Sequence, residues 1–137
     1  MAYWLFKTEP GTWSWGDQMN TDIEGWDGVR NHQACNNMRA MKIGDEGFFY
    51  HSVKEKQIVG VVKVAKEFHP DPSDASGKFG MVGITAVKPF KTLVTLADIK
   101  ADDRFEDIAL VRQSRLSVVP ISDDHWAALC AMGGVNP

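Results

Sequence analysis

The chain has 137 residues, of which 44% are hydrophobic and 24% charged, ordinary values for a soluble globular protein. This length suits one compact domain, so residues 1–137 are predicted to form a single unit. The net charge is −3, with 15 Lys and Arg against 18 Asp and Glu. Proteins that grip phosphates over their whole surface are usually basic, so this charge excludes that class and leaves only local contact with nucleic acid.

The sequence also argues against membrane, metal and cofactor proteins. No apolar run approaches the ~20 residues that cross a bilayer. The first residues lack the basic region and cleavage site of a signal peptide, so we expect a cytoplasmic protein. Cys35 and Cys130 are the only cysteines, too few for a structural zinc site. There is no phosphate loop, dinucleotide fingerprint or zincin motif, and we expect no metal and no cofactor.

The first third of the chain predicts one strand and two helices. Residues 3–7 are aromatic and apolar, which is typical of a strand. Ser14, with an acidic residue three positions later, is typical of a helix N-cap. A second helix is expected over 31–41, where Asn31 is a candidate cap and apolar residues recur on one face. Gly44 ends it.

The remainder of the chain predicts alternating strands and helices. We expect strands over 46–52, 58–66, 81–90 and 115–121, and helices over 96–100, 103–111 and 122–132. The segment 68–80 holds two each of Pro, Gly, Ser and Asp and is predicted to be a loop. Several mostly adjacent strands with helices between them indicate an α+β fold, a curved sheet or small barrel with helices outside.

The segment 26–31 is the most unusual stretch of the sequence. Trp26 comes directly before a polar turn and a helix start, which places an indole beside hydrogen-bonding groups. Stacking on such a ring contributes about 1–3 kcal/mol per base, and Asp27 or Asn31 would then read the edge of the base. Two interpretations stay open here, because Trp26 is also a candidate core residue and Asn31 a candidate helix cap. The four tryptophans Trp4, Trp13, Trp15 and Trp126 are assigned to the core.

Polar residues follow two predicted strands, a common position for functional groups. Thr8 and Glu9 end the first strand, and His51 and Ser52 end the strand over 46–52. The alternative is that these side chains are satisfied locally, with Glu9 paired to an arginine.

Basic residues form two groups that are candidates for phosphate contacts. Arg30, Arg39 and Lys42 are close in sequence, and Arg112 and Arg115 form the second group. Solvated helix faces explain the same residues equally well.

Signals for catalysis are weak. His32 and Cys35 have the spacing of a nucleophile and its base, or of two metal ligands. A single pair is too few for zinc, and no third group is evident to orient the histidine. We therefore expect that the chain is not an enzyme.

Five stretches together resemble one known family. They cover residues 3–10, 26–31, 37–41, 49–52 and 115–118, in the order in which that family carries them. On these motifs the chain resembles the EVE domains of the PUA-like superfamily, the bacterial relatives of thymocyte nuclear protein. The resemblance implies a PUA-like β-barrel flanked by short helices, similar to YTH domains.

The resemblance also implies a function and a set of site residues. It implies a non-catalytic module that holds a modified base of DNA or RNA, such as methylated or hydroxymethylated cytosine, in an aromatic pocket, with a nuclease or other protein as a further partner. The implied pocket residues are Thr8, Glu9, Trp26, Asp27, Asn31, His51 and Ser52, with His32 and Phe79 as further walls. An enzyme acting on nucleic acid or nucleosides, or a protein-interaction adaptor, are the alternatives.

Overall fold

One mixed sheet of six strands organises the protein, and the computed structural model describes all residues 1–137. The strands are β1 (Tyr3–Thr8), β2 (Glu24–Gly25), β3 (Glu46–His51), β4 (Gln57–Pro70), β5 (Gly80–Thr95) and β6 (Val118–Ile121). Their order across the sheet is β2-β5-β4-β3-β1-β6. Only β1 and β3 run parallel; every other neighbouring pair is antiparallel.

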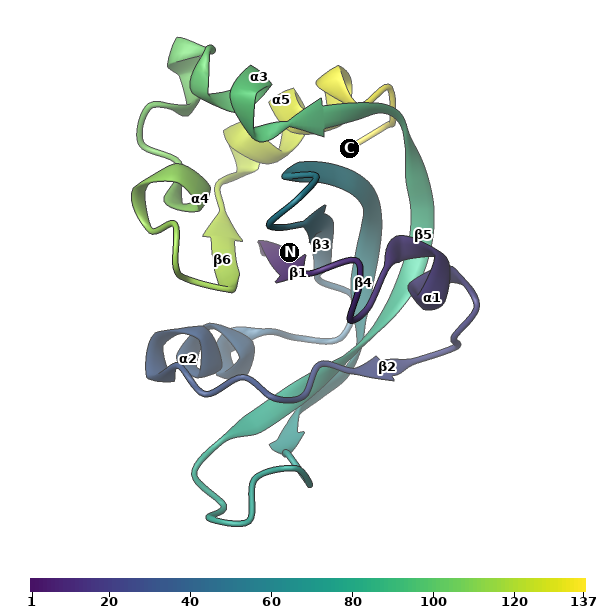
Figure 1. Ribbon diagram of the computed structural model, residues 1–137, viewed down its shortest axis with the longest axis vertical. Coiled ribbons are helices and arrows are strands. Elements are labelled where there is room, and N and C mark those ends of the chain that lie inside the picture. Colours follow the sequence, from purple (N-terminus) through teal and green to yellow (C-terminus); the bar gives the residue numbers. More distant parts are fainter.

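The sheet curves strongly without closing completely. The two long strands β4 and β5 shift register four times along their ladder, and bulges of this kind bend and twist a sheet. Figure 1 shows β4 and β5 sweeping around the shorter strands β1 and β3. The end strands β2 and β6 are not paired with each other, so the barrel keeps an open seam between them.

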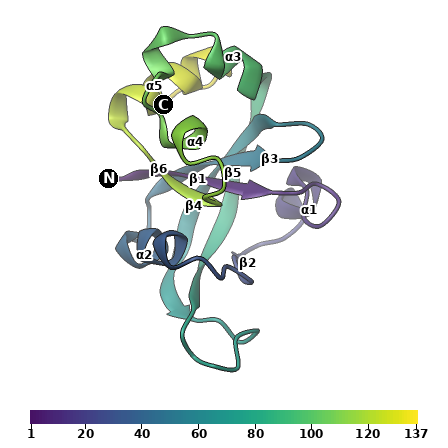
Figure 2. The same cartoon turned by 60° about the vertical axis from the view of Figure 1, so that its left-hand side comes forward.

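Short helices lie outside the curved sheet, most of them toward its two ends (Figure 1). They are α1 (Trp15–Met19), α2 (His32–Ala40), α3 (Leu96–Lys100), the 3-10 helix η1 (Asp103–Phe105), α4 (Ala109–Arg112) and α5 (Asp123–Met132). In both cartoon views α3, α4 and α5 gather at one end, while α2 lies toward the other end with the β4–β5 hairpin (Figures 1 and 2). None of these helices has the length and apolar composition of a membrane-spanning segment.

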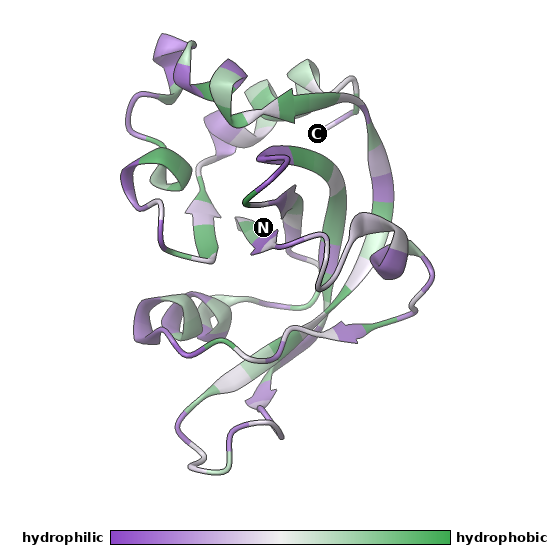
Figure 3. Cartoon of the chain, in the orientation of Figure 1, coloured by the Kyte–Doolittle hydropathy of each residue, from purple (hydrophilic) through white to green (hydrophobic).

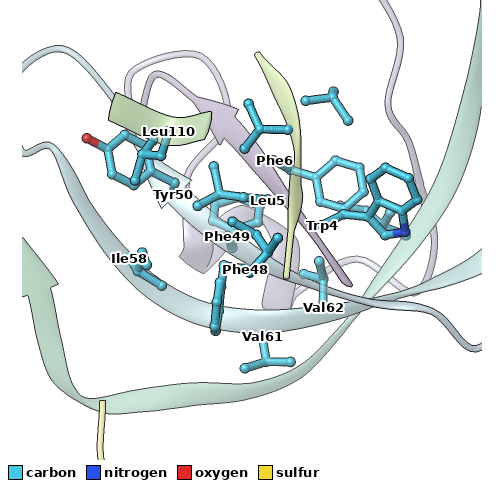
Figure 4. Close-up of a cluster of buried hydrophobic side chains, with 14 of the residues drawn as sticks. Trp4, Leu5, Phe6, Phe48, Phe49, Tyr50, Ile58, Val61, Val62 and Leu110 are labelled. Atoms are coloured by element: carbon cyan, nitrogen blue, oxygen red, sulfur yellow. The ribbon is translucent and has the colours of Figure 1, made fainter. Parts of the chain in front are cut away.

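The core is continuous and rich in aromatic side chains. It contains 33 buried hydrophobic residues, and Leu5, Phe6, Phe48 and Phe49 at its centre are fully buried (Figure 4). Hydrophobic segments recur along the strands, interrupted by hydrophilic ones, and the connections between elements are mostly hydrophilic or neutral (Figure 3). Gly60 is required by this packing, because a Cβ there would lie 2.5 Å from the ring of Trp15.

The α+β class and most predicted elements are confirmed, and three predictions are wrong. The predicted loop 68–80 is shorter, because Pro70 pairs with Gly80 and extends the hairpin. The helix predicted over 103–111 is two pieces, η1 and α4. The last strand begins at Val118 rather than at residue 115. The two-residue strand β2 had no sequence signal, since its only partner is the distant strand β5.

Candidate functional site

A cavity of about 290 Å³ lies at the open seam of the sheet. It is lined by the end of β1, the loop before α1, β2 with the segment that follows it, and the residue before β6. The lining residues are Lys7, Thr8, Thr12, Trp13, Glu24, Gly25, Trp26, Asp27, Gly28, Val29, Arg30 and Ser117. The cavity therefore exists because β2 and β6 leave a gap that the sheet does not close.

Two indoles line this cavity. Trp26 is 8% exposed and meets Phe6 and Phe49 edge-on, at centroid distances of 5.5 and 5.9 Å, without a parallel stack. Trp13 is half-buried, and its Nε1 donates a hydrogen bond of 3.0 Å to Oε1 of Gln18. Packing fixes the position of the Trp26 ring, and the hydrogen bond to the buried Gln18 amide fixes that of the Trp13 ring, so both rings have defined positions in the cavity wall.

The charged groups of the cavity differ from one wall to the other. Glu24 and Asp27 lie on the β2 side. The pKa of Glu24 is raised, mainly because the carboxyl is partly buried and to a smaller extent because the Asp27 carboxylate repels its charge. Lys7 lies on the β1 side, where burial lowers its pKa. Its Nζ donates to the carbonyl oxygen of Ser114 at 3.0 Å. The cavity thus offers hydrogen-bond acceptors on one wall and a cationic donor on the other.

A buried carboxylate holds the rim of the cavity. Asp71 is 3% exposed and accepts hydrogen bonds from the backbone N of Gly28 (2.8 Å), Nη1 of Arg30 (3.2 Å) and both the backbone N and Oγ of Ser73. Burial alone would raise the pKa of Asp71, but these hydrogen bonds together outweigh it and hold the pKa at about 2. The β4–β5 hairpin is thereby tied to the segment that carries Trp26.

Four of the residues predicted from the sequence meet at the cavity, namely Thr8, Trp26, Asp27 and Arg30. Thr8 Oγ1 donates to the carbonyl oxygen of Trp13 at 2.9 Å, so it positions that loop. Trp26 belongs to the core cluster, as one interpretation predicted, and it also lines the cavity. Arg30 lies at the rim, where its guanidinium pairs with Asp71.

Asn31 and His51 have structural roles away from the cavity. Asn31 caps α2, its side chain accepting a hydrogen bond from the backbone N of Ala34 at 2.9 Å. His51 is 7% exposed; its Nε2 accepts from the backbone N of Trp15 at 3.1 Å, and its Nδ1 lies 3.1 Å from Glu55. For both residues the structure favours local satisfaction over ligand contact.

His32 and Phe79 pack on each other outside the cavity. Their ring centroids are 5.0 Å apart, and the Arg30 guanidinium lies 5.5 Å from the Phe79 ring. They therefore adjoin the cavity through Arg30 without lining it. Cys35 is buried against the carbonyl oxygens of Val29 and Gly80, whereas His32 is exposed, so the two do not form a nucleophile–base pair.

The other predicted residues lie elsewhere. Glu9 is exposed, and its carbonyl oxygen accepts from the backbone N of Trp13. Ser52 lines a different cavity. Arg39 lies over the ring of Phe68 at 4.9 Å, and Arg115 is exposed; neither lines the seam cavity.

Five lining residues with polar or aromatic side chains were not predicted from the sequence: Lys7, Thr12, Trp13, Glu24 and Ser117. Trp13 was assigned to the core with the other tryptophans. A signal existed, because Trp13 follows a Pro-Gly turn and directly precedes the N-cap Ser14, so it belongs to neither strand nor helix. Glu24 and Ser117 carry no comparable signal, since only the seam brings them near Trp26.

Comparison with known proteins agrees with this architecture. The EVE domain family model matches residues 2–132. The crystal structure of an Agrobacterium tumefaciens protein is 47% identical, with a TM-score of 0.97 over 100% of this chain and 97% of that one. A YTH domain from Zygosaccharomyces rouxii, solved with N6-methyladenosine RNA, is 12% identical, with a TM-score of 0.60 over 99% and 88% of the two chains. It shares the fold, which confirms the PUA-like α+β expectation.

A human relative extends the comparison. Human thymocyte nuclear protein 1 is 33% identical over 170 residues, covering 99% of this chain and 76% of the human protein. Its structure in complex with DNA containing 5-methylcytosine is 31% identical, with a TM-score of 0.90 over the whole of both chains. Since the family model spans nearly the whole sequence and these relatives share its full fold, the chain belongs to the EVE domain family.

Proposed function

We propose that the chain is a nucleic-acid-binding module that holds a single modified base, such as methylated or hydroxymethylated cytosine, in the seam cavity. The observation that carries this proposal is the pair of indoles, Trp13 and Trp26, that line a cavity of about 290 Å³. The related human protein, solved with DNA containing 5-methylcytosine, supports the same ligand class. The module reads the base without transforming it, so a partner such as a nuclease would act on the nucleic acid.

The energetics favour single-stranded or weakly paired targets, in DNA or RNA. Removing a base from a duplex costs a few kcal/mol. Stacking on an aromatic ring returns about 1–3 kcal/mol. A methyl group that becomes fully buried adds only about 0.8 kcal/mol, roughly a fourfold preference. Stronger selectivity must therefore come from hydrogen bonds to the edge of the base.

The charged walls supply those hydrogen bonds. Glu24 or Asp27 would accept from an exocyclic amino group, and Lys7 would donate to a ring carbonyl oxygen. Cytosine carries both groups on one edge. Thymine would instead turn a carbonyl oxygen toward a carboxylate and leave both acceptors unpaired, which is costly in a desolvated site. The proposed preference is therefore for cytosine-type bases over thymine or uracil.

The test is binding of labelled single-stranded oligonucleotides with one cytosine, 5-methylcytosine or 5-hydroxymethylcytosine, in DNA and RNA, measured by fluorescence anisotropy. The variants are Trp13→Ala and Trp26→Phe, the second keeping a ring in the core. Phe79→Ala serves as an aromatic control, since Phe79 does not line the cavity. We expect the preference for a modified base in the wild type and in Phe79→Ala, and its loss in the two tryptophan variants. Equal preference in all four proteins would overturn the proposal.

A further inference from the structure

A second cavity, of about 510 Å³, lies beside the first. It is enclosed by the ends of β1 and β3, the β3–β4 turn, α3 and α4. Lys7, Lys56 and Lys100 line it together with Tyr50 and Ser52, and no acidic side chain does. Lys7 also lines the seam cavity, so the two cavities share one wall.

The charge of this cavity is unusual for the chain. Acidic residues outnumber basic ones by 18 to 15, yet three lysines from distant parts of the sequence converge here. None of the three forms an ion pair; the ion pairs of the structure involve Arg30, Arg104, His51 and His125. Lys7 is the most buried of the three, and burial without a carboxylate lowers its pKa. An anion in the cavity would offset the cost of burying the Lys7 ammonium group.

Polar donors complete the cavity. Tyr50 is 3% exposed, and its hydroxyl makes no hydrogen bond with another protein group. Figure 4 shows this hydroxyl directed away from the hydrophobic cluster, beside Leu110. Burial raises the pKa of Tyr50 to about 12, so the hydroxyl stays a donor at neutral pH. The buried side-chain polar atoms without a partner are Nε1 of Trp15 and Nε1 of Trp126, so the Tyr50 hydroxyl is open to the cavity and is free to donate to a bound anion.

The turn that carries Lys56 has an uncommon backbone. Val53 and Lys56 have φ values of 71° and 44°, the only positive values outside glycine. A β-branched valine in this region is strained, and such strain persists where surrounding structure imposes it, often beside ligands. The backbone oxygen of Lys56 accepts from the backbone N of Leu96 at 2.8 Å, which ties the turn to α3 and Lys100.

We propose that the cavity lined by Lys7, Lys56, Lys100 and Tyr50 is a binding site for a phosphate group. Two sources share this chemistry, a nucleic-acid backbone and a free phosphorylated molecule. The wall shared through Lys7 favours the backbone of the strand whose base enters the seam cavity. That assignment rests on the proposed function, whereas the phosphate site itself does not.

The first experiment titrates the protein with inorganic phosphate at constant ionic strength and follows backbone amides by NMR. Lys56→Gln and Lys100→Gln are compared with Lys54→Gln, a matched control in the same turn that does not line the cavity. We expect saturable chemical-shift changes at the amides of Val53 and Lys56 in the wild type and in Lys54→Gln. The phosphate affinity obtained from these changes should be at least fivefold lower in Lys56→Gln and Lys100→Gln. No saturable shift at these amides, or an equal loss in Lys54→Gln, would overturn the site.

The second experiment separates the two sources. Single-stranded oligonucleotides with one 5-methylcytosine carry either phosphodiesters or uncharged methylphosphonates beside that base. For a backbone phosphate, we expect tighter binding of the charged form, an advantage lost in Lys56→Gln, and a salt slope lower by about 0.7 in that variant. If both oligonucleotide forms bind equally, and the first experiment shows that the protein binds inorganic phosphate, the site is assigned to a free phosphorylated molecule.

If the proposed base pocket is wrong but the phosphate site is right, the two experiments give a different combination of results. Trp13→Ala would then leave the preference for 5-methylcytosine unchanged, while the phosphate titration would still distinguish Lys56→Gln from Lys54→Gln. If only the phosphate site is wrong, the phosphate-dependent amide shifts are absent while the wild type still prefers the oligonucleotide with a modified base.

Discussion

Two tryptophans of the same core, Trp126 and Trp26, have opposite surroundings. Trp126 on α5 is stacked against Phe48 and Tyr3, with centroids at 4.1 and 4.3 Å and interplanar angles of 20° and 12°. Trp26 beside β2 meets its neighbouring rings only edge-on and lines the seam cavity. The difference shows that burial does not define an aromatic residue's role. Trp126 is enclosed between two protein rings, whereas part of the Trp26 ring forms a cavity wall.

The largest expected effect is on the stacked residue. Trp126→Ala should lower the free energy of unfolding by about 3–5 kcal/mol, because it removes a fully buried indole and leaves a void. Urea denaturation measures this, with Trp13→Ala as the comparison, since Trp13 is only half-buried. Similar losses in both variants would erase the distinction between a stacked and a ligand-facing indole.

For oligonucleotide binding, we expect substitution of Trp13 to have a larger effect than substitution of Trp126. Trp13→Ala should weaken binding of an oligonucleotide with a modified base by about 1–3 kcal/mol, the contribution of one stacking surface. Trp126 lies outside the seam cavity, so Trp126→Phe should bind like the wild type under conditions where it is folded. Anisotropy titrations give both values, and weaker binding by Trp126→Phe than by Trp13→Ala would contradict the assignment.

Asp71 holds in place the cavity wall that carries Trp26, through its hydrogen bonds to Gly28 and Arg30. The pKa of this carboxyl is about 2 in the folded chain, against an ordinary 3.8. The ionised Asp71 therefore stabilises the folded state fully above pH 3.8, and this contribution to the free energy of unfolding is lost as the pH falls through 2. Asp71→Asn should cost about 2 kcal/mol at neutral pH and remove that part of the acid dependence. Denaturation between pH 2 and 7 tests this, with the exposed Asp103→Asn as control. An unchanged acid profile would show that Asp71 does not anchor the rim.

The smallest expected effect concerns selectivity. Glu24→Gln replaces a carboxylate acceptor by an amide that also donates, so it should reduce the preference for cytosine over thymine by about 1 kcal/mol, roughly fivefold. Competition with oligonucleotides that differ in this one base measures it. Glu106→Gln is the control, since Glu106 is exposed and does not line the cavity. A preference unchanged by Glu24→Gln would remove Glu24 from the reading of the base.

The sequence by itself determined the local elements and one wall of the site. The caps at Ser14, Asn31 and Ser122 are side-chain hydrogen bonds within three residues, so they are readable from neighbouring letters. Strands with β-branched and aromatic runs were found for the same reason. Trp26 and Asp27 stood out because a bulky ring directly precedes a glycine turn, and Gly28 does adopt the required positive φ of 77°.

Tertiary structure alone decided where the cavity lies and which residues complete it. The seam exists because β2 pairs only with β5, and β6 only with β1, and these partners lie about 58 and 115 residues away in the chain. Trp13, Glu24 and Ser117 line the same cavity only through that pairing. Asn31 and His51 satisfy neighbouring backbone groups instead. Because β pairing depends on register and burial summed over the whole sheet, no local pattern encodes these contacts.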